Sequence, residues 1–265
     1  MPHGARIFAA QRYRLSTLTV PSNLIVAVMT GRKELHTPYR SITAHQGQAV
    51  MMARGTQWDV VNDPHGQRQY EAWVLGFDDA LVREFHERAP AGMAPGISSA
   101  QVIALDEALV EALQRTLPGK HTPSAAVMKH RSLEALLLLA EKGCHFAPPQ
   151  TLSWTERIQR LIGQRIEADW NVRAMAHAFH MSESTLRRRL TDSGTTLAAI
   201  VREVRLQTAL GMLQTCDLSV GEVAQRCGWQ SHSRFTAAFQ QRWGVAPSVV
   251  RARMKESAQD LADPG

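Results

Sequence analysis

The sequence has few of the features that mark exported, membrane-spanning or zinc-binding proteins. Only three of its 265 residues are cysteines, Cys144, Cys216 and Cys227, and their spacing fits no zinc motif. An odd number of cysteines, with no apolar export signal in the first residues, predicts reduced thiols in a cytoplasmic protein. Apolar runs such as Ala135–Ala140 are far too short to span a membrane, so we expect no membrane partner.

Clustered metal ligands are also missing. A catalytic β-barrel usually combines a His-x-His pair with a later Glu and a further His, whereas His36, His45 and His65 are scattered along the chain. Turn or surface positions are the commoner explanation for such histidines. We therefore expect no metal, no cofactor and no catalytic residue.

Positive charge is concentrated in one part of the chain. Residues 155–255 hold 15 Lys and Arg against 8 Asp and Glu, which gives this region a net charge of +7. The whole chain has a net charge of +6. Residues 1–154 carry a net charge of only +2, and the last ten residues carry −3. At 265 residues two domains are expected, and the basic one has the charge that a phosphate-binding domain needs.

The basic region contains two copies of one helix-turn-helix pattern. Each copy has a short helix with a small residue in its second half (Ala176, Ala224), a turn, and a serine that can cap a second helix (Ser182, Ser231). Apolar anchors follow four residues apart, Leu186 with Leu190 and Phe235 with Phe239, and each copy ends near a glycine, Gly194 or Gly244. This internal duplication predicts a double helix-turn-helix.

Three adjacent arginines, Arg187, Arg188 and Arg189, lie on the second helix of the first copy. A run of this kind is usually a solvated helix face. Here it falls on the helix that such motifs insert into the major groove, where arginine binds guanine O6 and N7 in bidentate fashion. The position on the motif therefore favours DNA recognition over the solvated-face interpretation.

The whole pattern resembles the DNA-binding domain of the AraC/XylS family of bacterial transcriptional regulators. The resemblance covers about Thr155 to Arg253, including Trp170, Met181-Ser182, Arg205-Leu206 with Ala209 and Leu213, Gly228-Trp229 (the family usually has Gly-Phe), Gly244, Pro247 and Arg251. It implies two subdomains joined by a rigid helix, here about Thr196 to Thr215. Each subdomain would present one recognition helix to one of two successive major grooves.

Helix periodicity selects the side chains that should face DNA. With the anchors buried, the groove side of the first recognition helix holds Glu183, Ser184, Arg187 and Arg188. That of the second holds His232, Ser233, Thr236 and Ala237, and Arg234 is a further candidate for binding DNA. The second helix departs from the family, which commonly has Arg at Ala237 and Lys at Gln240. Arg234 or His232 then substitutes, or this unit binds through phosphates and DNA shape. We expect Arg205, Arg242 and Arg251 to contact phosphates or form internal ion pairs. Arg205 lies inside the expected linking helix, where the alternative is that it ties the two halves together. Trp229 and Trp243 are expected to be core residues.

Residues 1–75 hold short apolar segments separated by turn signals every eight to twelve residues, which predicts a small β-sandwich or barrel. The family often has a cupin-like barrel here that binds a small effector. If the effector is an anion such as a fatty acid, Arg32, Lys33 and Arg54 are candidate partners. Exposed turn cations are the commoner explanation for them.

Helical patterns follow the barrel. We expect helices over 77–88, 101–117 and 124–142, the last so apolar that it packs on the barrel, forms a homodimer interface, or both. Residues 143–154, with Pro148-Pro149, predict a linker, and 155–167 the first helix of the DNA-binding domain. The predicted organisation is α+β: a cupin-like barrel with a helical dimerisation segment over 1–142, an all-α double helix-turn-helix over 155–255, and a flexible tail over 256–265.

These features together predict a sequence-specific regulator of transcription that binds double-stranded promoter DNA. We expect an activator that contacts RNA polymerase, is not an enzyme, forms a homodimer, and senses a small molecule or dimerises through its barrel. A repressor would use the same DNA chemistry. A cupin-type enzyme with an accessory DNA-binding domain is the rival interpretation, and it requires the clustered His and carboxylates that the sequence lacks.

Overall fold

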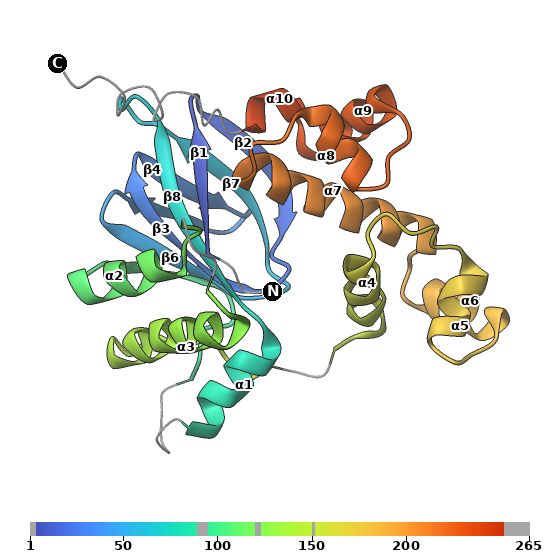
Figure 1. Cartoon of the computed structure of the whole chain (residues 1–265), viewed down its shortest axis with the longest axis horizontal. Helices are drawn as coiled ribbons and strands as arrows, with labels where there is room; N and C mark the ends of the chain where they lie inside the picture. The colour runs from blue at the N-terminus through green and yellow to red at the C-terminus, as the bar shows by residue number, and fades with distance from the viewer. Residues whose placement is uncertain (1–3, 89–94, 120–122, 150–151, 252–265) are drawn as a thin grey trace. The chain divides into compact units, whose positions relative to one another are not determined.

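The computed structural model describes residues 4–88, 95–119, 123–149 and 152–251 (Figure 1). The chain divides into two compact units, one made mainly of Met1–Pro149 and the other of Gln150–Arg242 with Ala246–Arg251. The predicted domain limits of 1–142, 143–154 and 155–255 stay predictions, and the tail expected over 256–265 lies outside the described residues.

The N-terminal unit is built on two antiparallel sheets. A five-stranded sheet has the order β1-β8-β3-β6-β9, and a four-stranded sheet has the order β2-β7-β4-β5. The strands are β1 (Ala5–Ala9), β2 (Tyr13–Thr19), β3 (Asn23–Thr30), β4 (Arg32–His36), β5 (Ser41–His45), β6 (Gln48–Met52), β7 (Gln57–Asp63), β8 (Tyr70–Phe77) and β9 (Ala100–Ala104). The sheet-rich N-terminal domain predicted from the spacing of turn signals is thus present.

Three helices cover one face of the five-stranded sheet: α1 (Asp79–Arg88), α2 (Glu107–Thr116) and α3 (Ala125–Glu141). Ile25 and Met51 on the sheet pack with Phe85 of α1, Leu109 of α2 and Leu136 of α3 in one apolar core. The central strands β3 and β6 are buried along most of their length because their other face looks toward the second sheet. This explains the nearly all-apolar composition of β3.

The helix predicted over 101–117 is wrong in its first part. Ala100–Ala104 form β9, which pairs with β6 in the register Ala49↔Ile103, and α2 begins only at Glu107, after its N-cap Asp106. The leucines spaced four residues apart, Leu105 to Leu117, predicted one helix because periodicity cannot detect strand pairing. The helix predicted over 124–142 is confirmed as α3, with Ser124 as its N-cap.

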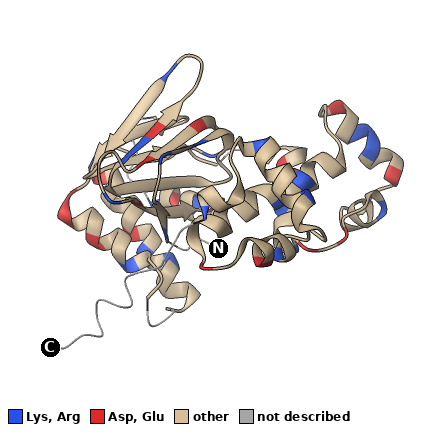
Figure 2. Ribbon diagram, turned by 90° about the horizontal axis from the view of Figure 1, so that it is seen from above, with Lys and Arg blue, Asp and Glu red and all other residues tan. Residues whose placement is uncertain are grey.

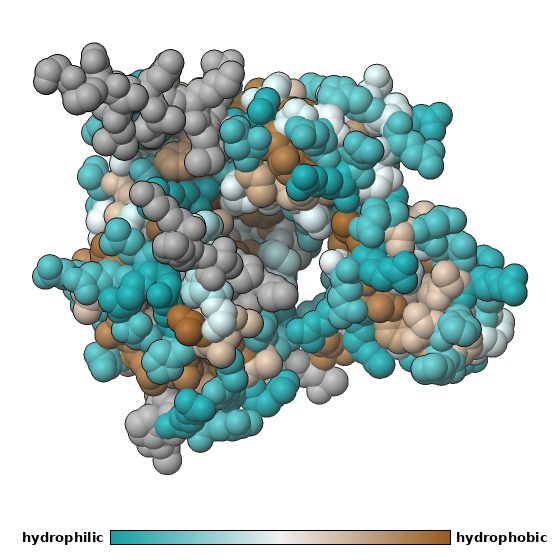
Figure 3. Space-filling view, in the orientation of Figure 1, coloured by the Kyte–Doolittle hydropathy of each residue, from teal (hydrophilic) through white to brown (hydrophobic). Residues whose placement is uncertain are grey.

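Helices are the only regular secondary structure in the described residues of the C-terminal unit. Its helices are α4 (Trp154–Gln164), α5 (Val172–Ala178), α6 (Glu183–Asp192), α7 (Leu197–Thr215), α8 (Val220–Arg226), α9 (His232–Trp243) and α10 (Pro247–Val250). The predicted linking helix is α7, with Thr196 as its N-cap. On the face drawn in Figure 3, hydrophilic side chains cover most of these helices.

A core shared by α4, α5, α6 and the first half of α7 holds the first helix-turn-helix together. It contains Ile162, Met175, Leu186 and Ile200, each 3% exposed or less. Helix α7 also contacts α8 and α10. One continuous helix thus packs against both helix-turn-helix units.

The described part of the chain has neither a membrane-spanning helix nor a cluster of metal ligands. No helix there is long and apolar enough to cross a membrane. No group of three or more His, Cys, Asp or Glu in the same ranges could hold a metal ion.

Candidate nucleic-acid interface

The first recognition helix, α6, is fixed at its start by its cap and along one side by its anchors. Ser182 accepts a hydrogen bond from the Thr185 N–H at 3.2 Å, as predicted for the N-cap. Leu186 and Leu190 are 0% and 4% exposed. Because these two anchors occupy one face, the residues between them point to solvent.

All four residues predicted to read DNA from α6 are exposed. Ser184 shares a 2.9 Å hydrogen bond with the Ser182 hydroxyl, and Arg187 lies 3.8 Å from the Glu183 carboxylate one turn earlier. Arg188 makes no hydrogen bond or ion pair with any residue that the structure describes. In Figure 2, where Lys and Arg are blue, broad blue bands lie on helices of the C-terminal unit. Arg188 is therefore the guanidinium of this helix that is available to a ligand.

The third arginine of the run, Arg189, has a different role. Its guanidinium lies 4.6 Å from the centre of the Trp154 ring, and Arg157 lies 5.0 Å from the same ring. A cation over an aromatic face is attracted by the quadrupole of the ring. Arg189 thus ties α6 to α4. Sequence reasoning missed this contact because 35 residues separate the partners and no local pattern signals it.

The second recognition helix, α9, repeats the arrangement. The Ser231 hydroxyl accepts from the Arg234 N–H at 3.3 Å, and Phe235 and Phe239 are fully buried, with ring centres 5.6 Å apart. Trp229, in the turn before the helix, packs edge-on against Phe235 at 5.7 Å and is half-buried. The anchors predicted for both copies are thus confirmed by the structure.

The residues predicted to read DNA from α9 differ in exposure. His232, Ser233 and Arg234 are exposed, whereas Thr236 is half-buried and its hydroxyl oxygen is buried without a hydrogen-bond partner among the described residues. Ala237 is exposed where the family commonly has an arginine. The exposed start of α9 therefore holds its candidate DNA contacts, and Thr236 is the weakest of the four.

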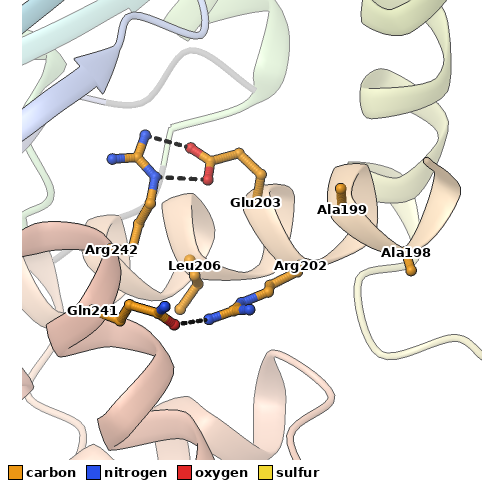
Figure 4. A pocket seen from close by; sticks show the side chains of 7 residues that line it. All are labelled: Ala198, Ala199, Arg202, Glu203, Leu206, Gln241 and Arg242. Atoms are coloured by element: carbon orange, nitrogen blue, oxygen red, sulfur yellow. Dashed lines mark hydrogen bonds and ion pairs between the residues drawn. The ribbon is translucent and has the colours of Figure 1, made fainter. Parts of the chain in front are cut away.

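Internal bonds hold α9 against α7. Arg242 binds Glu203 through two hydrogen bonds of 2.8 and 2.7 Å, and Arg202 donates to Gln241 at 2.7 Å. These side chains line a groove of about 500 Å³ together with Ala198, Ala199 and Leu206 (Figure 4). Arg251 lies 3.9 Å from Asp217. Arg242 and Arg251 thus form internal ion pairs, one of the two roles predicted for them.

The turns of the two copies have the same backbone conformation but different residues. Gly228 has φ +76°, and His180, at the same place after α5, has φ 52°. A side chain in this left-handed region is strained, whereas glycine adopts it freely. The residues that end the two copies, Gly194 and Gly244, also have positive φ.

We expect His180→Gly to raise the free energy of unfolding by about 0.5–1 kcal/mol, because it relieves this strain. His177→Gly, inside α5, is the matched control and should lower it by a similar amount. Urea denaturation measures both changes. A loss of stability in His180→Gly would mean that the imidazole makes a stabilising contact that outweighs the strain.

The three candidate effector cations of the N-terminal unit lie in different environments. Arg32 is on the outer face of β4, 2.9 Å from Asp63 and 3.0 Å from Glu34. Arg54 donates to Asp79, in the first turn of α1, at 2.6 Å. Lys33 is 5% exposed and points between the sheets, because side chains alternate along a strand. Arg32 and Lys33 were expected in a turn, but the turn ends at Gly31 and both lie in β4.

Lys33 belongs to a buried polar cluster. Its ammonium donates to the side-chain Oδ1 of Asn62 at 2.8 Å, and the side-chain Nδ2 of Asn62 donates to the Tyr13 hydroxyl at 2.7 Å. The Tyr70 ring, from the opposite sheet, lies 6.0 Å from the ammonium, and its hydroxyl has no partner among the described residues. No carboxylate in the described ranges pairs with Lys33. Burial lowers the pKa of the Lys33 ammonium to about 7 and raises the pKa of the Tyr70 hydroxyl.

Two protein families match the chain. Residues 175–253 match the family described as "Helix-turn-helix domain", and residues 23–146 match "ExsA N-terminal regulatory domain". HTH-type transcriptional regulator GadX of Escherichia coli O6:H1 is 31% identical over 109 residues, which are 41% of this chain and 39% of GadX. The urease operon transcriptional activator of Escherichia coli is 27% identical over 152 residues, 55% of this chain and 51% of that protein. The chain thus spans about two fifths to one half of these relatives.

Solved structures of ToxT from Vibrio cholerae strain SCE256 share the fold. The apo protein matches with a TM-score of 0.64 and 14% identity over 94% of this chain and 95% of ToxT. Wild-type ToxT with a bound unsaturated fatty acid matches with a TM-score of 0.61 at the same identity, over 94% and 93%. The predicted α+β class, with a sheet-rich N-terminal part and a helical C-terminal part, is confirmed.

Proposed function

We propose, from the premise that this chain is a member of the AraC/XylS family of transcriptional regulators, that it binds promoter DNA in a sequence-specific manner. Helices α6 and α9 enter successive major grooves of one duplex. The contacts come from Glu183, Ser184, Arg187 and Arg188 on α6 and from His232, Ser233, Arg234 and Thr236 on α9. The chain performs no catalysis and acts in the cytoplasm. Residues 1–142 form the effector-binding or dimerisation domain, 143–154 the linker and 155–255 the DNA-binding domain.

The observation that carries this proposal is the free guanidinium of Arg188 on a capped, half-buried helix. Arg189 and Arg242 are bound to protein partners, whereas Arg188 is exposed and has none in the described residues. Holding a bidentate donor on a rigid helix lowers the entropy lost when it binds guanine. A solvated helix face explains the exposure equally well, but it does not explain why a second copy of the same motif follows.

A selection experiment tests DNA binding directly. The full chain is mixed with a library of random duplexes, bound duplexes are recovered and sequenced, and the cycle is repeated. We expect one enriched sequence with two boxes about one helical turn apart, because the two units read successive grooves. Enrichment of no sequence, with only salt-sensitive binding to every duplex, would contradict the proposal.

The same family premise supports an activator that contacts RNA polymerase and works as a homodimer. Leu133, Leu136 and Leu139 of α3 are buried, but Val127 and Leu137 are 44% and 47% exposed, which leaves apolar surface for a second copy. Sedimentation of the full chain, with Leu137→Lys as the variant, tests the homodimer. A fully monomeric wild type at micromolar concentration would contradict it.

We also propose that the barrel of the N-terminal unit binds an effector with a carboxylate, such as a fatty acid. Lys33 would bind the carboxylate, since Arg32 and Arg54 already pair with protein carboxylates. The interior between the sheets offers apolar side chains for a hydrocarbon tail, and ToxT, which shares the fold, has been solved with an unsaturated fatty acid bound.

A monounsaturated C16 fatty acid should raise the melting temperature of the wild type and leave the melting temperature of Lys33→Met unchanged. The shift should be larger at about pH 6.5 than at about pH 8.5, because the amine with a pKa of about 7 loses its charge as pH rises. Differential scanning fluorimetry measures both, and Arg32→Met is the matched control that should respond like the wild type. Equal shifts in all three proteins would remove Lys33 from the site.

A further inference from the structure

The side chain of Arg205 joins the two halves of the DNA-binding unit. It lies near the middle of α7, half-buried, and its guanidinium donates three hydrogen bonds to backbone carbonyls. Two of them go to Ile166 at 3.1 Å and Ala168 at 3.0 Å, in the segment between α4 and α5 of the first half. The third goes to Gly228 at 3.1 Å, in the turn between α8 and α9 of the second half.

The second half is shaped to receive this guanidinium. A Cβ on Gly228 would lie 2.8 Å from both Cζ and Nη2 of Arg205, which is closer than real contacts allow. Gly228 also has φ +76°, which glycine adopts without strain. The turn before α9 therefore packs directly on Arg205, the same side chain that binds the segment between α4 and α5.

We propose that Arg205 aligns the two recognition helices, so that both units can bind DNA only when their boxes have one separation and one rotational phase. This rests on the DNA-binding function proposed above. The planar fork of arginine fixes three acceptors in defined directions, whereas the ammonium of lysine is a flexible point donor. Loss of the guanidinium should therefore let the two helix-turn-helix units change their relative orientation, while each unit keeps its own core.

If Arg205 aligns the two recognition helices, DNA binding depends on the spacing of the boxes, which a merely stabilising role of Arg205 would not cause. Two boxes on one duplex bind a rigid pair of units with a high effective concentration, and that advantage disappears when geometry forbids both contacts. A half-turn insertion between the boxes puts them on opposite faces of DNA. A rigid protein loses one contact there, whereas a protein with a freer angle is less sensitive to the insertion.

The test compares Arg205→Lys with the wild type, both as the full chain, on three duplexes. One carries both selected boxes, one carries a single box, and one has about five base pairs inserted between the boxes, about half a helical turn. We expect Arg205→Lys to bind the two-box duplex about tenfold more weakly and the single-box duplex within about twofold of the wild type. The insertion penalty, which is the factor by which the inserted base pairs weaken binding to the two-box duplex, should also be about tenfold smaller in Arg205→Lys than in the wild type.

Arg202→Lys is the matched control, because Arg202 lies one turn earlier on α7 and its hydrogen bond to Gln241 does not reach the segment between α4 and α5. It should keep the wild-type insertion penalty. An unchanged insertion penalty in Arg205→Lys, or an equal loss on single-box and two-box duplexes, overturns the alignment role. If Arg205→Lys does not fold, Arg205→Gln enters the same comparison, and unfolding of both variants also overturns it.

The outcome separates this inference from the function on which it rests. If the wild type enriches no duplex from the random library, DNA recognition itself fails. If the wild type selects two boxes and Arg205→Lys keeps the wild-type insertion penalty, DNA recognition stands and the alignment role of Arg205 fails.

Discussion

Arg188→Ala should weaken binding to the selected duplex by about 1–3 kcal/mol and relax the preference at one base step. The reason is the geometry of α6: the cap at Ser182 and the buried Leu186 and Leu190 fix the helix, and Arg188 points out with no protein partner in the described residues. A bidentate contact to guanine is lost with the side chain. Binding curves on the selected duplex and on its single-base variants measure both effects.

Arg189→Ala is the matched control for this experiment, because it removes a neighbouring arginine that stacks on Trp154 at 4.6 Å. It should lower the stability of the DNA-binding unit and leave the base preference unchanged. The assignment of Arg188 would be wrong if Arg188→Ala left the preferred sequence intact while His232→Ala altered it. A uniform loss of affinity across all sequences would instead make Arg188 a phosphate contact.

The two recognition helices are unequal in ways that bear on this prediction. In the second unit the exposed Ala237 and Gln240 stand where the family commonly has Arg and Lys, and Thr236 is half-buried. The start of α9 keeps His232 and Arg234 exposed. We therefore expect the box read by α6 to show stronger base preferences than the box read by α9, where phosphate contacts and DNA shape contribute more.

Local patterns predicted the C-terminal unit well. Capping serines and anchors four residues apart are short-range features, and Ser182 and Phe235 have the cap and the burial that the sequence indicated. The terminal Gly194 has positive φ, which the structure adds. The resemblance to the AraC/XylS family and the α+β class are confirmed. Which arginine remains free was harder to predict, because the contact of Arg189 with Trp154 and the three bonds of Arg205 join distant segments.

Tertiary pairing decided what local patterns could not in the N-terminal unit. Residues 101–104 were predicted to start a helix, but their pairing with β6 makes them part of β9. The inward direction of Lys33 depends on the register of β4 against β7, which places Lys33 opposite Asn62. A shift of one residue would exchange Lys33 with Arg32, so the sequence could name both cations but could not separate them.

Lys33→Met should remove a rise in stability that the wild type shows as pH increases from about 7 toward about 10. Burial lowers the pKa of the Lys33 ammonium from 10.5 to about 7 in the folded chain. Between these values the unfolded chain holds a proton that the folded chain has released, so the free energy of unfolding rises with pH. Below pH 7 both states are charged, and the cost of burying the charge is present in full.

The difference in unfolding free energy between Lys33→Met and the wild type should therefore be most positive at about pH 6 and decrease by about 1–4 kcal/mol by about pH 10. Urea denaturation at several pH values measures this difference. Burial raises the pKa of Cys227 to about 11, so that thiol destabilises the fold at high pH, but it does so in both proteins and cancels. Lys129→Met, at an exposed lysine paired with Glu84, is the matched control and should show a flat difference.

Parallel stability curves for wild type and Lys33→Met would place the amine in contact with water and remove the basis for an effector site there. If this difference in unfolding free energy changes with pH, Lys33 titrates inside the fold, and its titration can then be used to detect the proposed effector. A bound carboxylate stabilises the charged ammonium and raises its pKa, so the wild type saturated with fatty acid should lose most of its pH dependence. Binding would then take up a proton above about pH 7, which calorimetry in buffers of different ionisation enthalpy detects.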